Sequence, residues 1–503
     1  MSGRAATDRI LRGRFGISVN DPGHPTPPGW VRTPLTDIAD LGTGHTPSRN
    51  HPEYWDGDVP WIGIRDAGAH HGGIINTTAQ TITPLGLENS SARMLPKETV
   101  CLSRTASVGY VVKMGRDMAT SQDFVTWSCS QALDPDFLMS ALLAEGEDIR
   151  KFGEGSTHTT IYFPAVKAFH LDLPPITEQR RIVAKLDALT ARIARARAEL
   201  ARVPVLAEKL RQSVVVDAFS GRLTEELRRA SQLKAEDNEH LDNLFARKTK
   251  AKRKKPAAAI DWQPKLAIPD EWRWVSVDRV IAIAQYGSSS KTDENSDGVP
   301  VLRMGNIQSG ELDFSNLKYL PLGHHEFPDL LLTDGDVLFN RTNSFELVGK
   351  SAVFRGASRP MSYASYLIRL QCCGILPDLL VRYLNSPLGR SWIESVASQQ
   401  VGQANVNGTK LRSLGIPLPS EEEQVEMKRL MDVAFARADR LEAEAARARK
   451  LLDRLESTIL AKAFRGELVP QNPNDEPAEK LLKRIRADRA AAPKPKRARR
   501  AAT

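Results

Sequence analysis

Two short segments of the chain contain part of a catalytic motif, and neither contains the whole. A methyltransferase would need Asp, Asn or Ser before a Pro-Pro pair and an aromatic residue after it. Here Leu173 precedes residues 174–175 and Ile176 follows them, which favours a rigid bend before a helix. Residues 348–351 end like a phosphate-binding loop, but Ser344 stands where that loop needs its first glycine. No H-E-x-x-H, G-x-S-x-G or G-x-G-x-x-G pattern occurs, so we expect no active site in this chain.

The cysteines likewise predict no chemistry. They form no C-x-x-C pair and have no histidine at ligand spacing, so we expect reduced thiols and no metal site. The four are Cys101, Cys129, Cys372 and Cys373. The first residues lack the apolar stretch of a secretory signal, and no segment reaches the length of a membrane span, so we expect a cytoplasmic protein.

Positive charge is concentrated in two segments. The net charge is +9, of which residues 247–255 contribute +7 and residues 481–503 contribute +8, leaving −6 for the rest of the chain. Runs of this kind are usually solvated, so we expect a basic linker at 227–268 and a basic, disordered tail at 469–503. Charge alone therefore does not identify a nucleic-acid-binding protein.

The chain is a tandem duplication with halves of about 240 residues. Residues 28–30 match 269–272, residues 58–66 match 298–306, residues 100–105 match 337–342, and residues 173–179 match 418–424. Within each half, short β-branched and aromatic runs separated by Gly, Pro, Asn and Asp give way to a helical pattern. The sequence thus predicts a β-rich α/β domain followed by a long helix, twice.

The two predicted helices have the same length. Gln179 and Phe219 are 40 positions apart, as are Gln424 and Phe464, and Gly221 and Gly466 follow as C-terminal caps. At 1.5 Å per residue each helix would be roughly 60 Å long. Apolar residues recur at heptad spacing along each helix. They are Ile182, Leu186, Leu189, Ile193, Ala196, Leu200 and Val203 in the first, and Leu430, Ala434, Leu441, Ala448, Leu451, Leu455 and Ile459 in the second.

Two equal helices with one apolar seam each most simply pair with one another. An antiparallel pair would place one globular domain at each end, as a molecular ruler does. We expect a kink at Pro204 in the first helix. Outward residues such as Arg180, Arg181, Glu423 and Glu426 are predicted to face a partner or solvent.

The domain–helix–domain–helix order resembles the specificity subunits of type I restriction–modification enzymes, from about residue 28 to 468. The first half is similar to a target-recognition domain through Trp30, residues 46–49, 54–55, 58–66 and 104–105. The second half is similar to a different subtype through residues 299–307, 335–338, 340–342 and 348–350. The resemblance implies an N-terminal arm at 1–27, recognition domains at 28–174 and 269–418, and spacer helices at 175–226 and 419–468. The predicted fold class is mixed α/β, with two β-rich α/β recognition domains joined by two long antiparallel coiled-coil helices in pseudo-twofold symmetry.

The resemblance also implies a mechanism. Each recognition domain would read one half of a bipartite, asymmetric double-stranded DNA site, and the paired helices would fix the gap. Two methyltransferase (modification) subunits would dock on the helices, and motor–nuclease (restriction) subunits would join them. S-adenosylmethionine, ATP and Mg would be bound by those partners, with no cofactor in this chain. We expect no self-association.

Candidate DNA-binding residues occupy equivalent loops of the two halves. Asn and Gln can hold adenine, and Arg can hold guanine, through two hydrogen bonds. For Arg104 and Arg341, which share a turn in both halves, a structural role is the alternative. In the first half the candidates are Thr46, Ser48, Arg49, Arg65, Arg104, Ser107 and His158. In the second half they are Ser288, Ser289, Lys291, Arg303, Arg341, Asn343, Gln403 and Asn405.

Two other hypotheses about the function stay open at this point. A coiled-coil scaffold unrelated to DNA explains the helices but not two unlike domains at matched spacing. A fused methyltransferase or nuclease with its own reader domain requires a cofactor motif, which the sequence lacks. The bases recognised and the length of the gap cannot be read from the sequence.

Overall fold

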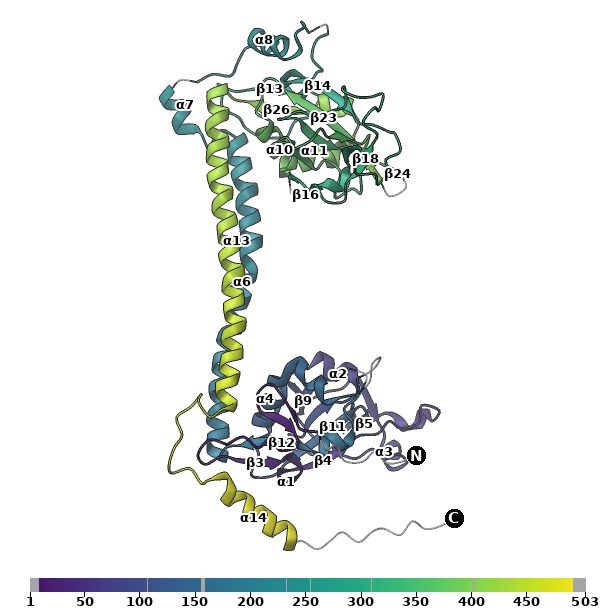
Figure 1. The fold of residues 1–503 in the computed structure, drawn as a ribbon, viewed down its shortest axis with the longest axis vertical. Coiled ribbons are helices and arrows are strands. Elements are labelled where there is room, and N and C mark those ends of the chain that lie inside the picture. The colour runs from purple at the N-terminus through teal and green to yellow at the C-terminus, as the bar shows by residue number, and fades with distance from the viewer. Residues whose placement is uncertain are drawn as a thin grey trace. The chain divides into compact units, whose positions relative to one another are not determined.

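The computed structural model describes residues 9–105, 107–154, 159–231, 233–253, 255–308, 310–400 and 403–491. The chain divides into two compact units, here called unit 1 (Met1–Leu200 and Ala448–Thr503) and unit 2 (Ala201–Arg447). Each unit holds one recognition domain together with parts of both long helices (Figure 1).

The recognition domain of unit 1 is built on a five-stranded sheet. Its strand order is β4 (Ala39–Thr43), β11 (Phe124–Cys129), β8 (Val100–Ser103), β9 (Val111–Met114) and β6 (Ile74–Ile75). All neighbours are antiparallel except β6 and β9. Helix α4 (Pro135–Glu145) covers β8 and β9, and Trp127 and Phe137 are fully buried in the resulting core. This sheet is the rigid support for the loops considered below.

Two smaller sheets complete the domain. One has the order β10 (Ala119–Thr120), β5 (Trp55–Ile62) and β7 (Gln80–Ile82), and the other β1 (Leu11–Arg12), β2 (Ile17–Val19), β12 (Phe169–Leu173) and β3 (Val31–Pro34). The short helices are α1 (Leu35–Ile38), α2 (Ile64–Ala69), α3 (Pro84–Glu88) and α5 (Phe163–Lys167), with 3₁₀ turns η1 (Pro52–Tyr54) and η2 (Gly146–Phe152).

The predicted N-terminal arm is wrong as a separate segment, because β1 and β2 belong to the sheet that contains β12 and β3. The buried carboxylate of Glu145 accepts hydrogen bonds from the backbone N–H groups of Arg14, Phe15, Gly16 and Ile17. These four donors leave the carboxylate well satisfied, so the turn between β1 and β2 is fixed against the end of α4.

Unit 2 repeats the strand order of unit 1. Its main sheet is β14 (Ile281–Tyr286), β23 (Leu367–Cys372), β19 (Val337–Asn340) and β21 (Ser351–Val353). Its smaller sheet is β18 (Lys318–Leu320), β15 (Val299–Leu302) and β22 (Ser362–Tyr363), and β13 (Arg273–Ser276) pairs with β26 (Gly415–Leu418). As β5 does with β10, β15 runs parallel to β22. The predicted tandem duplication of a mixed α/β domain is confirmed.

The remaining elements of unit 2 are short. They are α9 (Val277–Val280), η3 (Met304–Asn306), β16 (Ile307–Gln308), β17 (Glu311–Leu312), β20 (Thr342–Asn343), α10 (Pro377–Asn385), α11 (Pro387–Val396), β24 (Ser398–Gln400), β25 (Gln403–Asn405) and α12 (Gly408–Arg412).

The two long helices, α6 (Ile176–Phe219) and α13 (Glu421–Phe464), have 44 residues each, as the equal spacing in the sequence predicts. They pack together in both units (Figure 1). In unit 1, Arg197 binds Asp453 and Glu456. In unit 2, Arg211 binds Asp439 and Glu442. The chain just after α6 meets the first turn of α13, so the helices are antiparallel. Helix α6 continues through Pro204, and the kink stays a prediction.

The predicted seam of α6 is confirmed, whereas that of α13 is right at Ile459 and wrong at three of its leucines. Ile182, Leu186 and Ile193 are buried on α6. On α13, Leu441, Leu451 and Leu455 are 43, 61 and 48% exposed. The buried positions of α13 are Met427, Met431, Ala438, Ala445, Ile459 and Ala463. This set recurs mainly at intervals of seven, so a heptad repeat is present. Alanines occupy two of its central positions, and the larger leucines lie on the exposed side of the helix.

The basic linker and basic tail each contain a docked helix, which corrects the prediction of a solvated linker and, over residues 469–491, that of a disordered tail. Residues 492–503 lie outside the described part of the chain. After α7 (Glu225–Ser231), α8 (Asn238–Thr249) packs against α9 and buries Leu241. In unit 1, α14 (Ala478–Ala491) packs against α1 and buries Ala478 and Leu482. Both segments follow a long helix that ends in a glycine with positive φ, namely Gly221 and Gly466. The linker and the tail thus begin in the same way, with a positive-φ glycine two residues after the helix ends.

Candidate nucleic-acid interface

Each recognition domain is fastened to the start of a long helix by the same three side chains. In unit 1 the indole N–H of Trp30 donates to Glu178 Oε1 at 3.1 Å. In unit 2 that of Trp272 donates to Glu423 Oε2 at 2.7 Å. The carboxylates lie in the first turn of α6 and α13, where the helix dipole favours negative charge. These hydrogen bonds fix the recognition domain, which carries the candidate residues, relative to the start of the helix.

The next residue of each helix completes the attachment. The Gln179 amide donates to the carbonyls of Ala132 and Pro174, and its oxygen accepts from the backbone N–H of Asp134. Gln424 donates to the carbonyls of Gly374 and Pro419 and accepts from the N–H of Leu376. Both amides are fully satisfied on their buried sides, so the bend at Pro174 in unit 1 and at Pro419 in unit 2 is held rigidly.

The two carboxylates differ in their surroundings. Glu423 also accepts from Arg228 Nη1 and Thr224 Oγ1, each at 2.6 Å, and is 1% exposed. The prediction that Glu423 faces solvent or a partner is therefore wrong. Among the described residues Glu178 has no such buried ion pair, and burial raises its pKa, an effect opposed by the Trp30 hydrogen bond. Nearby, Arg181 binds Asp475 of the tail, which lowers the pKa of that aspartate.

Three of the seven first-half candidates gather at one end of the β5–β7 sheet. Arg49 is exposed, stacks on the Trp55 ring and donates to Gln80 Oε1 at 3.0 Å. Thr46 donates to the Gln122 side chain, and the Ser48 carbonyl accepts from the Trp55 indole N–H. The loop before β5 thus presents hydroxyl and guanidinium groups beside the Trp55 ring.

Arg104 lies next to this group but is held differently. Its guanidinium stacks on Phe163, with 4.9 Å from Cζ to the ring centre, and donates to the Gln122 carbonyl at 3.2 Å. Its Nε is buried without a hydrogen-bond partner among the described residues, and burial lowers the pKa of the group. Arg104 therefore ties the loop after β8 to that before β11.

The other first-half candidates are less close. Arg65 is exposed on α2, and Ser107 contributes its carbonyl to the Ser103 hydroxyl within the turn between β8 and β9. His158 lies outside the described residues.

Arg341 repeats the arrangement of Arg104 in unit 2. It stacks on Tyr286 at 5.0 Å, donates to the Ser365 carbonyl at 3.2 Å, and has a buried Nε without a partner among the described residues. Ser365 precedes β23 as Gln122 precedes β11. The structural interpretation raised for both arginines thus has direct support, and each retains further N–H groups for a ligand.

Three second-half candidates meet on a small sheet of order β20, β25 and β24. Asn343 pairs with Ala404, and the Asn405 amide donates to Thr342 Oγ1 at 3.1 Å. Gln403 begins β25, and its side chain lies outside the described part of the chain. Asn343 and Asn405 therefore lie on paired strands, one register position apart.

The remaining second-half candidates separate into two groups. Ser288 is 4% exposed and bonded to Glu326, which indicates a structural role, while Ser289 and Lys291 are exposed. Arg303 donates to the Asn316 carbonyl and lines a hollow of about 620 Å³. Asn343, Lys350 and Tyr366 share this hollow.

Sequence reasoning missed the polar partners of these candidates. Gln80 and Gln122 are exposed and bonded to Arg49 and Thr46, and Lys350 and Tyr366 line the hollow beside Asn343. Tyr366 is 47% exposed, an unusual state for a large aromatic residue. No motif marks these residues, because each comes from a separate strand or loop.

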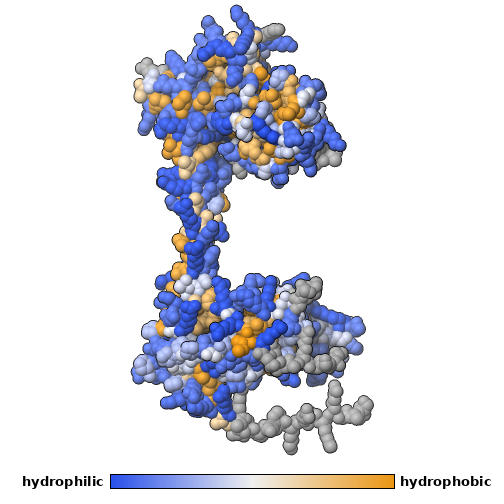
Figure 2. All heavy atoms as spheres, viewed as in Figure 1, coloured by the Kyte–Doolittle hydropathy of each residue, from blue (hydrophilic) through white to orange (hydrophobic). Residues whose placement is uncertain are grey.

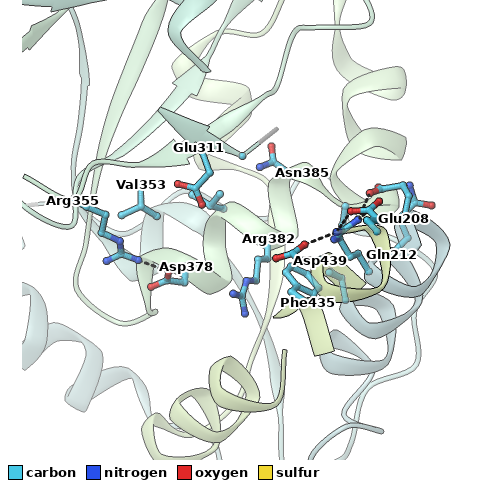
Figure 3. Close-up of a pocket in the computed structure, with 16 residues that line it drawn as sticks. Glu208, Gln212, Glu311, Val353, Arg355, Asp378, Arg382, Asn385, Phe435 and Asp439 are labelled. Atoms are coloured by element: carbon cyan, nitrogen blue, oxygen red, sulfur yellow. Dashed lines mark hydrogen bonds and ion pairs between the residues drawn. The ribbon is translucent and has the colours of Figure 1, made fainter. Parts of the chain in front are cut away.

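A second hollow in unit 2 has a different character. It lies between the helix pair and α10, has a volume of about 630 Å³, and is drawn in Figure 3 with Arg355 directed at Asp378. Its carboxylates outnumber its arginines, five to three. They are Glu208, Glu311, Asp378, Asp439 and Glu442, against Arg211, Arg355 and Arg382. The lining therefore carries net negative charge, which disfavours phosphate.

No group of His, Cys, Asp and Glu able to hold a metal ion occurs within the described residues, and no described helix is both long and apolar enough to span a membrane. Burial raises the pKa of all four thiols, to about 12 for Cys129 and about 11 for Cys373. The cysteines are free, as predicted.

On the face shown in Figure 2, hydrophilic residues cover most of the paired helices.

Comparison with known proteins identifies this architecture. A family model described as the type I restriction modification DNA specificity domain matches twice, over residues 27–204 and 269–447. The EcoKI specificity subunit of Escherichia coli (strain K12) is 25% identical over 484 residues, which cover 92% of this chain and 96% of that protein.

Solved structures share the fold. A chain from a type I R-M system, described for its complex assembly and conformational transition, has a TM-score of 0.62 at 19% identity and covers 88% of this chain and 100% of its own. The HsdS subunit of Thermoanaerobacter tengcongensis has a TM-score of 0.58 at 20% identity, with 89 and 99% coverage. Because both copies of the family's domain are present and together span more than half of the sequence, this protein belongs to the family of type I restriction modification DNA specificity domain proteins.

Proposed function

We propose that this chain is the subunit that reads DNA sequence in a type I restriction–modification enzyme, and that each unit reads one half of a bipartite, asymmetric site. The observation that carries the proposal is the repeated attachment of a recognition domain to a 44-residue helix, through Trp30, Glu178 and Gln179 in one unit and Trp272, Glu423 and Gln424 in the other. A scaffold would have no need to fix two unlike domains in the same way.

The DNA-facing surface of unit 1 is the loop set around Thr46, Arg49 and Arg104, and that of unit 2 is the set around Arg341, Asn343 and Asn405. Side chains of these types bind base edges and phosphates. The two sets differ in sequence on a common frame, which supports different half-sites. The paired helices would then set the gap between those half-sites.

Two methyltransferase subunits would dock on the helix pair and adjoining surfaces, and motor–nuclease subunits would join that core. A chain with two repeated faces suits two copies of one partner. The acidic hollow of Figure 3, which disfavours phosphate, is available to a protein partner that presents basic groups. S-adenosylmethionine, ATP and Mg would be bound by the partners.

The test is a map of N6-methyladenine across the genome of a strain that expresses the partner methyltransferase, with and without this gene. We expect loss of one motif made of two short defined halves around a fixed gap. An unchanged map in a strain with a working partner would reject the proposal. Methyl transfer by the purified chain alone would instead favour the fused-enzyme reading.

A further inference from the structure

We propose that Arg49 of unit 1 reads a guanine base, and that Trp55 and Gln80 hold its guanidinium ready to do so. This inference rests on the proposed function and adds to it one specificity-determining residue with its ligand. Arg49 lies on the exposed loop before β5, its Cζ is 3.8 Å from the centre of the Trp55 ring, and its Nη2 donates to Gln80 Oε1 at 3.0 Å.

The loop that carries Arg49 is fixed by two tryptophans. The indole N–H of Trp61 donates to the His45 carbonyl at 3.0 Å, and that of Trp55 donates to the Ser48 carbonyl at 3.3 Å. The two rings pack edge to face, with their centres 5.3 Å apart. Backbone on both sides of Thr46 and Pro47 is therefore set without DNA, and binding need not order it.

Gln80 holds Arg49 from the neighbouring strand. It is the register partner of Trp61 in the β5–β7 pair, so its position is set by the sheet rather than by the loop. Ring stacking covers one face of the guanidinium plane, and Gln80 takes one N–H at its edge. Of five N–H groups, four stay available, and no other acceptor for Arg49 exists among the described residues.

A planar guanidinium presented by its edge fits guanine best. Guanine offers the acceptors O6 and N7 in the major groove, which one guanidinium can engage together, whereas adenine places an amino donor beside N7. A phosphate would accept the same N–H groups at every sequence, so it would not distinguish bases. The fixed orientation of the Arg49 guanidinium favours contact with a base edge, because an arginine without a fixed orientation is sufficient to bind a phosphate.

Arg104 provides the contrast within the same unit. It too stacks on an aromatic ring, but it is half-buried and bonded to a backbone carbonyl, so it positions a loop. The second unit lacks the arrangement, because Val301 stands in the sequence position that matches Trp61 and Lys291 follows Ser290 in its loop. A guanine read in this way should therefore occur in one half-site alone.

The experiment uses this chain assembled with its partner methyltransferase and duplexes that contain the mapped motif. Each guanine in turn is replaced by 7-deazaguanine, which lacks the N7 acceptor. We expect the wild-type complex to lose affinity roughly 10-fold or more at one guanine. Arg49→Ala should bind more weakly and be insensitive at that same position. Arg116→Ala, another exposed arginine of unit 1, should behave as wild type.

Methylation maps give the second readout. Arg49→Ala should relax one guanine of one half-site and leave the other half unchanged. Equal sensitivity of wild type and Arg49→Ala to every 7-deazaguanine, or a uniform loss of affinity without relaxed specificity, would overturn the inference. The bipartite motif of the wild-type complex would stand in that case, so the two proposals fail separately.

Discussion

At the scale of single residues, the two attachments at the helix starts show how one geometry can be reached with different electrostatics. Glu423 pairs with Arg228, whose side chain is 9% exposed, whereas Glu178 accepts from Trp30 and has no buried cation bonded to it in the part of the chain that the structure describes. Removal of charge should therefore be costly in unit 2 and mild in unit 1, because Arg228 would keep only its longer ion pair with Glu271, at 3.6 Å from Nε.

Glu423→Gln is expected to destabilise unit 2 by about 3 kcal/mol, since Arg228 loses its close buried partner and keeps only the half-exposed Glu271. Glu178→Gln keeps an acceptor for Trp30 and should cost below about 1 kcal/mol. Thermal unfolding by calorimetry of the two matched variants measures the difference. Equal shifts in the two variants would show that the Arg228 pair contributes nothing.

The pH dependence of the Glu178 variant has a defined sign. Burial raises the pKa of Glu178 in the folded state above its ordinary value of 4.5. The contribution of this group to stability is therefore complete below pH 4.5 and is lost as pH rises through the folded pKa. Glu178→Gln does not titrate, so its stability relative to wild type should increase from pH 4 to pH 7. A constant difference over that range would contradict the shifted pKa.

At the scale of elements, the seam of α13 shows where hydrophobic size misleads. Ala438 and Ala445 are buried between the helices, while the larger Leu441 lies outside. Small residues at these positions allow the backbones to approach, so a larger side chain cannot be accommodated without movement.

Ala438→Leu is expected to destabilise unit 2 by about 1–3 kcal/mol through overpacking. Leu441→Ala, on the exposed side of the same helix, should change stability by less than about 0.5 kcal/mol. Chemical denaturation followed by circular dichroism measures both. The opposite ranking would restore the register that the leucines suggest.

The tail helix α14 gives a second prediction at this scale. Leu482 is 2% exposed where α14 packs on α1, so Leu482→Glu should place a charge in an apolar contact and release the helix. Amide hydrogen exchange along 478–491 should then become fast, while Lys480→Glu, at an exposed position, leaves it slow. Unchanged protection in Leu482→Glu would show that α14 is held by other contacts.

These elements also show what the sequence can and cannot predict. The duplication, the strand-rich domains and the equal helices follow from repeated segments and periodicity. That Arg104 and Arg341 occupy equivalent positions follows from the turn sequence that the two halves share. The docking of α14 could not be predicted, because Ala478 and Leu482 lie in a basic, alanine-rich segment with a weak apolar stripe. The Arg49–Trp55–Gln80 contact joins a loop and two strands, and long-range contacts of that kind have no local signal.

At the scale of the whole molecule, the proposed ruler can be tested by changing its length. One heptad inserted into both helices at opposed positions, after Arg202 in α6 and after residue 448 in α13, preserves the seam because seven residues restore the register. Seven residues add about 10 Å of helix, which corresponds to roughly three base pairs. The methylated motif should keep both half-sites and gain a gap longer by that amount.

Insertions into one helix alone provide the matched control. With the partner helix unchanged, the inserted residues have no opposing seam, so the pair must bulge or slip and methylation should fall sharply at every site. Half-sites that stay intact in the double insertion would show that the recognition domains fold and read DNA normally. A double insertion that methylates the original motif with the original gap would mean that the helices do not set the spacing, and that the partner subunits do so instead.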